Sequence, residues 1–279
     1  VYKRQMYELD EQAYQYYLYY GVGSLQNCIT GFKGEQTLTT AIMNVTDSNP
    51  KSVGVISKSN GEYIYSATEP NVFAMTATET LLDENGYDVS ELDIVTDTLD
   101  AEKYDILILP APAVDLTTDA ITKLKDYLHN GGNLGKQLIY IADYTQNSTP
   151  NLDAFLKEWN IAVDNSYVND EDSSSNQAAR VLIGNGKAYS FPRVTISADE
   201  AYNGSLNNAS LPIVAPMARP IDTLTANNGR TVNPLLTTSA NSYRYPLGDR
   251  SAAQQEDTAL NCLLYTSRAH ETAANLVCR

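Results

Sequence analysis

Two short apolar runs constrain the fold of this chain most, because each is followed by a helical pattern. Residues 52–57 and 104–109 have the length of strands, and the second run ends at Pro110-Ala111-Pro112. A strand with one solvent-exposed face alternates between apolar and polar residues, whereas a strand buried on both faces is apolar throughout. The two runs therefore predict parallel strands that are covered on both faces.

Helical patterns and further strands separate or follow these runs. The helices are predicted near 70–84, 117–130 and 149–159, and the further strands near 89–94 and 138–142. Thr117 can cap the second helix, and Pro150 suits the first turn of the third. After about 168 the pattern weakens into short strands. The order predicts an open, mostly parallel α/β sheet flanked by helices over about 50–168. An irregular, β-rich part is expected over about 169–250.

Both ends of the chain resemble translated sequencing adapter. Residues 1–5, VYKRQ, can be encoded by GTG TAT AAG AGA CAG, and the reverse complement of this string in another frame encodes CLLYT, which is residues 262–266. One inverted DNA sequence, similar to the transposon end of tagmentation libraries, thus accounts for both ends. Such segments are set aside before a fold is inferred. We expect 1–5 and 261–279 to be adapter-like, non-native, disordered and dispensable, and 6–260 to be one native domain.

Composition excludes several classes of partner. The formal net charge is −15, which disfavours binding to nucleic acid and to anionic lipid. Apart from the adapter-like ends, Cys28 and His129 are the only residues of their kinds. The acidic loop 169–172 lacks the glycine and terminal glutamate of a calcium-binding loop. We therefore expect no disulfide, no metal site and no cofactor.

The candidate contact residues lie near the ends of predicted strands. They are Glu62, Pro110, Pro112 and Asp143. Open α/β sheets bind ligands outside the carboxyl ends of their strands. A pair of carboxylates there could act as acid and base, but acidic residues are abundant in this chain, so we interpret these positions as a contact surface.

Two other motifs have simpler interpretations than catalysis. Residues 131–136, GGNLGK, are similar to a phosphate-binding loop, but they are one residue too short and join a helix to a strand. We interpret them as a helix end. His129, in the last turn of the same predicted helix, suits the negative end of the helix dipole.

Several blocks of the chain resemble, in order, the GldG-like family of gliding-motility ABC-transporter auxiliary proteins. These blocks are FKGEQTLTTAI at 32–42, DILIL at 105–109 with the following Pro112 and Gly131-Gly132, PNLDAFLKEWNI at 150–161, and PLLTTS at 234–239. Asn160 replaces a glycine of the family pattern. The resemblance implies a fold similar to class I glutamine amidotransferases and to the related intraflagellar-transport domain.

The resemblance also implies a function. We expect a non-catalytic, extracytoplasmic binding or coupling domain at the cell membrane, anchored by helices outside this fragment. Its partners would be the ABC-2-type permease and ATPase subunits of the same system. Two alternatives stay open. An amidotransferase-like hydrolase needs a nucleophile at a strand-to-helix turn and a histidine base. A surface glycan-binding domain is suggested only by the 20 tyrosines.

Overall fold

The structure is a computed structural model of the chain. It describes residues 7–9, 26, 29–32, 34–47, 49–59, 75–144, 146–170, 180–183, 187–190, 193–196, 213–215, 218–225, 229–246, 255–256, 261–268 and 271–278. The chain divides into two compact units. The first unit is Val1–Lys51 with Thr76–Val89, and the second is Ser52–Met75 with Ser90–Arg279.

The first unit contains a short strand pair and two helices. Strands β1 (Tyr7–Leu9) and β2 (Ile29–Phe32) pair antiparallel, and the helices are α3 (Gly34–Thr46) and α4 (Thr76–Glu84). The predicted end of α4 is confirmed. The Asn85 side-chain amide donates a hydrogen bond to the Leu81 carbonyl at 2.7 Å, and Gly86 adopts a positive φ of 83°.

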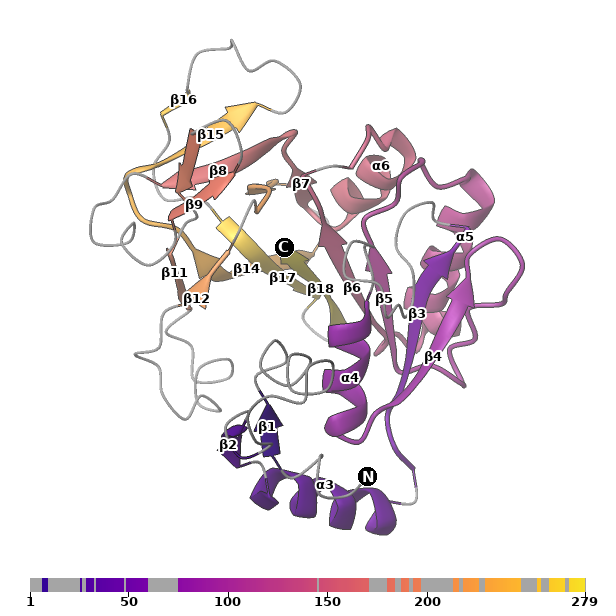
Figure 1. Ribbon diagram of the computed structural model, residues 1–279. Coiled ribbons are helices and arrows are strands. Elements are labelled where there is room, and N and C mark those ends of the chain that lie inside the picture. The colour runs from indigo at the N-terminus through magenta and orange to yellow at the C-terminus, as the bar shows by residue number, and fades with distance from the viewer. Residues whose placement is uncertain are drawn as a thin grey trace. The chain divides into compact units, whose positions relative to one another are not determined.

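The second unit is built on a nine-stranded sheet in the order β12-β11-β14-β17-β18-β6-β5-β3-β4. Its first strands are β3 (Ser52–Lys58), β4 (Asp88–Asp93), β5 (Ile106–Pro110) and β6 (Gln137–Ala142). The later strands of this sheet are β11 (Arg193–Ile196), β12 (Ile213–Val214), β14 (Arg230–Thr237), β17 (Asn261–Arg268) and β18 (Glu271–Cys278). Neighbours from β3 through β5 and β6 to β18 run parallel, and those from β18 to β12 run antiparallel (Figure 1).

Two helices pack on one face of the parallel strands. Helices α5 (Thr118–His129) and α6 (Pro150–Glu158) share one buried cluster with residues of β5 and β6. In that cluster Leu124 and Phe155 join Leu107 and Tyr140. Ile108, which points to the opposite face, is only 2% exposed. Both faces of the central strand are therefore covered, as its unbroken apolar run predicted.

Helix α5 has the ends that the sequence predicts. The Thr117 hydroxyl accepts a hydrogen bond from the Ala120 N–H at 3.2 Å, which caps the first turn. Asn130 ends the helix in the left-handed conformation and begins the short 3₁₀ turn η2 (Asn130–Gly132), in which Gly131 also has a positive φ of 61°. The glycine-rich stretch is therefore a helix end, as interpreted.

Smaller antiparallel sheets make up the rest of the second unit. The strands are β7 (Ile161–Val163), β8 (Ser166–Asp170), β9 (Arg180–Ile183), β10 (Lys187–Ser190), β13 (Ile221–Thr223), β15 (Ser242–Pro246) and β16 (Gln255–Glu256). They form the pairs β13-β7 and β10-β9 and the three-stranded sheet β16-β15-β8. Arg244 joins two of these sheets through a bidentate contact with Asp222, at 2.6 and 2.9 Å, and an ion pair with Asp164 at 3.1 Å.

The expected fold class is confirmed. A parallel α/β core, an open sheet flanked by helices, precedes an antiparallel, β-rich C-terminal part.

One expectation about the C-terminal end is wrong. Residues 261–278 were expected to be disordered, but β17 and β18 lie inside the sheet, and β18 pairs parallel with β6 from Leu138 to Ala142. The sequence of this segment is rich in β-favouring residues, and the register of the two strands places Leu263 opposite Val277. The origin of the segment in adapter DNA remains a prediction, and residues 1–5 lie outside the described residues.

Candidate functional site

The loops that follow the parallel strands meet at one edge of the sheet. Pro110 is in register with Ile141, so β5 and β6 end side by side. At the other side of β5, Ser57 near the end of β3 donates to Glu91 of β4 at 2.8 Å. We call this region the carboxyl edge and define it as the described residues 57–59, 91–99, 110–117, 142–144 and 146–151. It is the place where open α/β sheets carry their ligands.

Side-chain contacts bind the loops after β5 and β6 to each other. The Asp115 carboxylate accepts from the Asn151 N–H at 2.8 Å and from the Leu152 N–H at 3.3 Å. Thr149, at the N-cap of α6, makes no side-chain cap of its own. Asp115 therefore caps α6 from a different loop, and its charge suits the positive end of that helix.

Two amides complete this connection. The Asn151 side chain donates to the Leu116 carbonyl at 2.8 Å, and the Asn147 side chain donates to the Ala113 carbonyl at 2.8 Å. Each bond holds backbone of the first loop to a side chain of the second. The two loops consequently form one connected structure.

A buried chain of polar groups runs beneath the same loops. The Tyr140 hydroxyl donates to the Gln146 carbonyl oxygen at 2.6 Å, and the Gln146 amide donates to the Thr149 hydroxyl at 3.0 Å. The Thr149 hydroxyl faces the Asp153 carboxylate at 3.5 Å. Burial raises the pKa of Asp153, while the nearby Arg219 and Lys157 charges act to lower it. These groups satisfy one another, which is the usual condition of buried polar side chains.

Lysine and carboxylate contacts fix the loops after β3 and β4. Lys58 forms an ion pair with Glu91 at 2.9 Å, and this contact raises the pKa of Lys58. The hydroxyl of Ser59 and the backbone N–H of Val95 hold the pKa of Asp93 below its usual value. Lys58 and Asp93 are therefore both charged at neutral pH.

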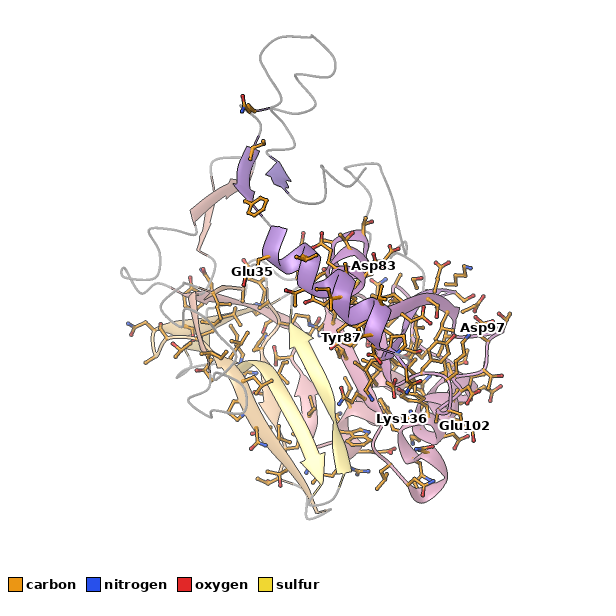
Figure 2. The ribbon with its side chains drawn as sticks, turned by 90° about the horizontal axis from the view of Figure 1, so that it is seen from below. Glu35, Asp83, Tyr87, Asp97, Glu102 and Lys136 are labelled. Atoms are coloured by element: carbon orange, nitrogen blue, oxygen red, sulfur yellow. The ribbon has the colours of Figure 1, made fainter. Side chains whose placement is uncertain are left out.

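Lys123 of α5 secures the loop after β4 through its backbone. Its Nζ donates to the carbonyls of Ile94, Val95 and Asp97 at 3.1, 2.7 and 2.8 Å. Three acceptors satisfy all three donors of the ammonium group. Asp97 lies on this loop and Glu102 on the segment that leads to β5 (Figure 2).

The structure brings together three of the four predicted contact residues. Pro110, Pro112 and Asp143 all lie at the carboxyl edge, on adjacent strand ends, and all three are buried. Glu62 lies outside the described residues. Since buried prolines offer no side-chain surface, these positions shape the turn, and the accessible surface belongs to their neighbours. The contact role of the four residues remains a prediction.

Sequence reasoning missed Asp115, Asn151 and Lys123. Asp115 directly precedes a leucine and a capping threonine, so a local interpretation assigns it to α5. Its real partners lie on α6, 36 and 37 residues away. No local pattern in the sequence predicts such a long-range contact.

His129 lies at the other end of α5, beside a cavity of about 310 Å³. The cavity is lined by Lys125, Asp126, Leu128, His129, Leu134, Phe155, Glu158, Trp159 and Arg230. The Arg230 guanidinium stacks over the Trp159 ring at 4.3 Å and donates to the Glu158 carbonyl at 2.6 Å. No cysteine, serine or threonine is among these described lining residues, so none of them offers a hydroxyl or thiol nucleophile beside His129.

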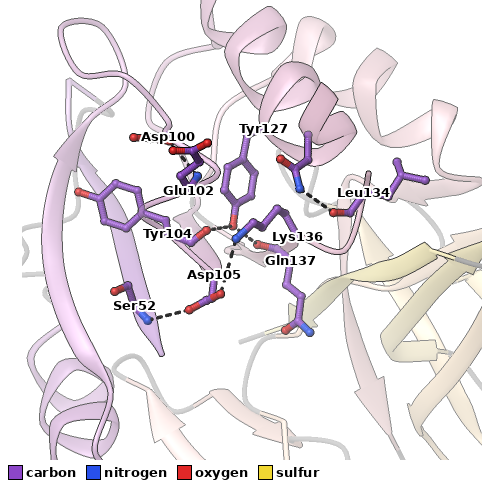
Figure 3. A network of polar contacts seen from close by, with 10 residues as sticks. Ser52, Asp100, Glu102, Tyr104, Asp105, Tyr127, Leu134, Lys136 and Gln137 are labelled. Carbon is purple, nitrogen blue, oxygen red and sulfur yellow. Dashed lines mark hydrogen bonds and ion pairs between the residues drawn. The ribbon is translucent and has the colours of Figure 1, made fainter. Parts of the chain in front are cut away.

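A polar network secures the strand starts at this end of the sheet (Figure 3). The Asp105 carboxylate accepts from the Ser52 N–H at 3.1 Å and faces the Lys136 Nζ at 3.6 Å. The Tyr127 hydroxyl donates to the Tyr104 and Gln137 carbonyls, both at 3.4 Å, and burial raises the pKa of Tyr127. Lys136 of the glycine-rich stretch is therefore held by a carboxylate of the fold.

The described part of the chain contains no group of three or more His, Cys, Asp or Glu side chains that could hold a metal ion. No helix in that part is long and apolar enough to cross a membrane.

Comparisons with known proteins identify relatives of the chain. The model of a family described as ABC-type uncharacterized transport system matches residues 50–276. No curated protein sequence matches the chain significantly.

Solved structures give a second comparison. The N-terminal domain of mmIFT52 is similar with a TM-score of 0.52 and 14% identity, over 81% of this chain and 85% of that one. A ThuA-like protein from Bacteroides uniformis has a TM-score of 0.45 and 17% identity, over 83% and 82% of the two chains. A GMP synthase protein from Thermoplasma acidophilum has a TM-score of 0.35 and 11% identity, over 83% and 84%. At these identities, the mmIFT52 likeness shows the fold alone.

Proposed function

Since this chain belongs to the ABC-type uncharacterized transport system family, we propose that it is a non-catalytic auxiliary domain of an ABC-2-type transporter, of the GldG-like kind. In this proposal the domain faces outside the cytoplasm at the cell membrane and is anchored by helices outside the present chain. It works with the permease and ATPase subunits of the same system.

The observation that carries the non-catalytic part is the composition of the two turns that follow β5 and β6 at the carboxyl edge. In a hydrolase of this fold class, the nucleophile would sit at a sharp turn after a central strand. Here the turn after β5 is Pro110-Ala111-Pro112, and β6 is followed by Asp143-Tyr144. None of these side chains is a thiol or an aliphatic hydroxyl. The polar groups nearby, Asp115 and Asn151 among them, are engaged in holding the loops.

The position of His129 supports the same proposal. His129 ends α5, which starts just after the β5 turn and leads away from it to the start of β6. A base must lie within hydrogen-bond reach of the proton that it removes. A helix of 12 residues is about 18 Å long, which is well beyond that reach.

An activity assay tests the hydrolase alternative. We expect the purified protein to release no ammonia from glutamine and to cleave no simple amide above the buffer rate. Hydrolysis that is abolished by Cys28→Ala or by His129→Ala would overturn the non-catalytic proposal.

A partner assay tests the transport proposal. The full-length protein, tagged in its native cells and gently solubilised with its membrane, should co-purify with a permease and an ATPase of one ABC-2-type system. Protease added to intact spheroplasts should digest the domain, because it faces outside. Recovery without either subunit, or full protection from the protease, would contradict the proposal.

A further inference from the structure

In the described part of the second unit, the exposed large apolar side chains lie on loops of the carboxyl edge. Where the structure describes side-chain exposure in this unit, the exposed large hydrophobics are Val95, Val114 and Tyr144, at 59%, 61% and 38%. They lie on the loops that directly follow β4, β5 and β6, respectively. Single exposed apolar residues are ordinary, but here all three fall on loops at one edge. We call these three residues the edge patch.

The loops that carry the edge patch are held in place by the contacts described above. The Val95 carbonyl accepts from Lys123 at 2.7 Å, and the carbonyl of Ala113, which precedes Val114, accepts from Asn147. The turn that contains Tyr144 is closed by a bond from the Gln146 N–H to the Asp143 carbonyl at 3.2 Å. Rigid loops lose little conformational entropy on binding, so apolar groups on them favour association.

The surroundings of the edge patch are acidic. Asp97 lies two residues from Val95, and Asp119 is exposed in the first turn of α5. The cations at the described part of this edge are already engaged. Lys58 is paired with Glu91, and Lys123 donates to three carbonyls. The potential at the edge is therefore negative, in keeping with the net charge of −15.

We propose that the edge patch is the docking surface for a basic, amphipathic protein segment of the transporter, in which apolar side chains are flanked by lysine or arginine. This inference rests on the proposed function, and it adds the location of the contact and the chemistry of the partner. The apolar part of the segment covers the edge patch, and its cations meet the acidic surroundings. Nucleic acid and anionic lipid carry the wrong charge for this surface.

Substitution of the edge patch tests the location. The variant Val95→Ser/Val114→Ser/Tyr144→Ser removes the apolar surface but keeps all charges, and Leu81→Ser is the matched control, because Leu81 is 58% exposed in the first unit. In the co-purification assay on the full-length protein, we expect the triple variant to recover at least about tenfold less permease, because loss of apolar contacts at the centre of an interface weakens binding. The control should stay within about twofold of the parent protein. Unchanged thermal unfolding of both variants shows that folding is preserved.

Cross-linking tests the chemistry of the partner. A photo-reactive benzoylphenylalanine in place of Val114 should cross-link to a permease peptide that contains lysine or arginine beside apolar residues. A cross-link to lipid or to an acidic peptide would overturn the inference. Normal permease recovery by the triple variant would also overturn it while leaving the proposed function intact. Failure of the parent protein to recover permease would instead refute both.

Discussion

Replacement of Gly54 by alanine separates backbone preference from packing, because the two predict changes of opposite sign in the free energy of unfolding. Gly54 lies in the middle of β3 and is buried. In a strand that had room, alanine would stabilise the folded state by about 0.5–1 kcal/mol, because glycine loses more conformational entropy on folding.

The structure leaves no room for the added methyl group. A Cβ at Gly54 would lie 2.9 Å from Leu107 Cδ2 and 3.3 Å from Tyr104 Cδ1, and closer still to Leu92 Cδ1. Leu107 is fully buried and Leu92 is 4% exposed, so neither can move into solvent. Overpacking of this kind costs about 1–3 kcal/mol. We therefore expect Gly54→Ala to lower the free energy of unfolding by about 2 kcal/mol, and the melting temperature by about 6 °C.

Urea unfolding followed by circular dichroism measures this change. A second variant supplies the control. Leu92→Val removes the Cδ atom in question, so Gly54→Ala should cost at least about 1 kcal/mol less in that background than in the parent protein. A single variant as stable as the parent, or more stable, would refute the packing of β3 against β4 and β5. Additive effects in the double variant would show that Leu92 is not the obstacle.

Four other changes test the remaining parts of the fold. Asp115→Ala should lower the free energy of unfolding by about 1–2 kcal/mol because it uncaps α6, and Asp115→Asn should cost less, as measured by urea unfolding. Asp153→Asn should raise the melting temperature at pH 7. The raised pKa of Asp153 means that ionisation of this buried carboxyl destabilises the folded state. The loss of stability is fully present above the folded-state pKa and disappears as pH falls through that pKa, because the carboxyl is then protonated. The gain should therefore vanish near pH 3, and an equal gain at both pH values would refute the assignment. Ile108→Asp should abolish cooperative melting, because it buries an unpaired charge; a soluble variant that melts cooperatively would contradict the central position of β5. A chain that ends at 260 leaves β6 without β18, so we expect it to lose cooperative melting, whereas melting within about 2 °C of the parent would favour the adapter origin of 261–279.

The local elements of the parallel core could be predicted from the sequence because each has its own signal. The apolar run before Pro110 indicated β5, Thr117 marked the start of α5, and Pro150 marked the start of α6. In each case the deciding interaction is within a few residues of the signal. The short strands predicted after about 168 were also confirmed, β9 and β11 among them.

The candidate site was predictable only in its location. The rule that parallel strands end at one edge placed Pro110, Pro112 and Asp143 together, but it could not tell that they are buried. The loops around them are joined by bonds between Asn151 and Asp115 and between Asn147 and Ala113, and these pairs are more than thirty positions apart. The edge patch was missed for a related reason. An apolar residue after a strand is read as part of the core unless its exposure is known.

Asn160 shows how a departure from a family pattern can keep the structure intact. The pattern has glycine at this position, and the backbone explains why, because Asn160 has a φ of 62° and lies in the left-handed region. Asparagine is among the non-glycine residues that adopt this conformation most readily. Its side chain, which glycine lacks, donates to the Arg230 carbonyl at 3.1 Å, and its own carbonyl accepts from the Leu224 N–H at 2.8 Å. The turn after α6 is therefore bonded to the start of β14, whose Arg230 side chain stacks on Trp159. The replacement thus preserves the turn and adds a bond between the parallel core and the β-rich part, which argues that these two parts of the second unit act as one body.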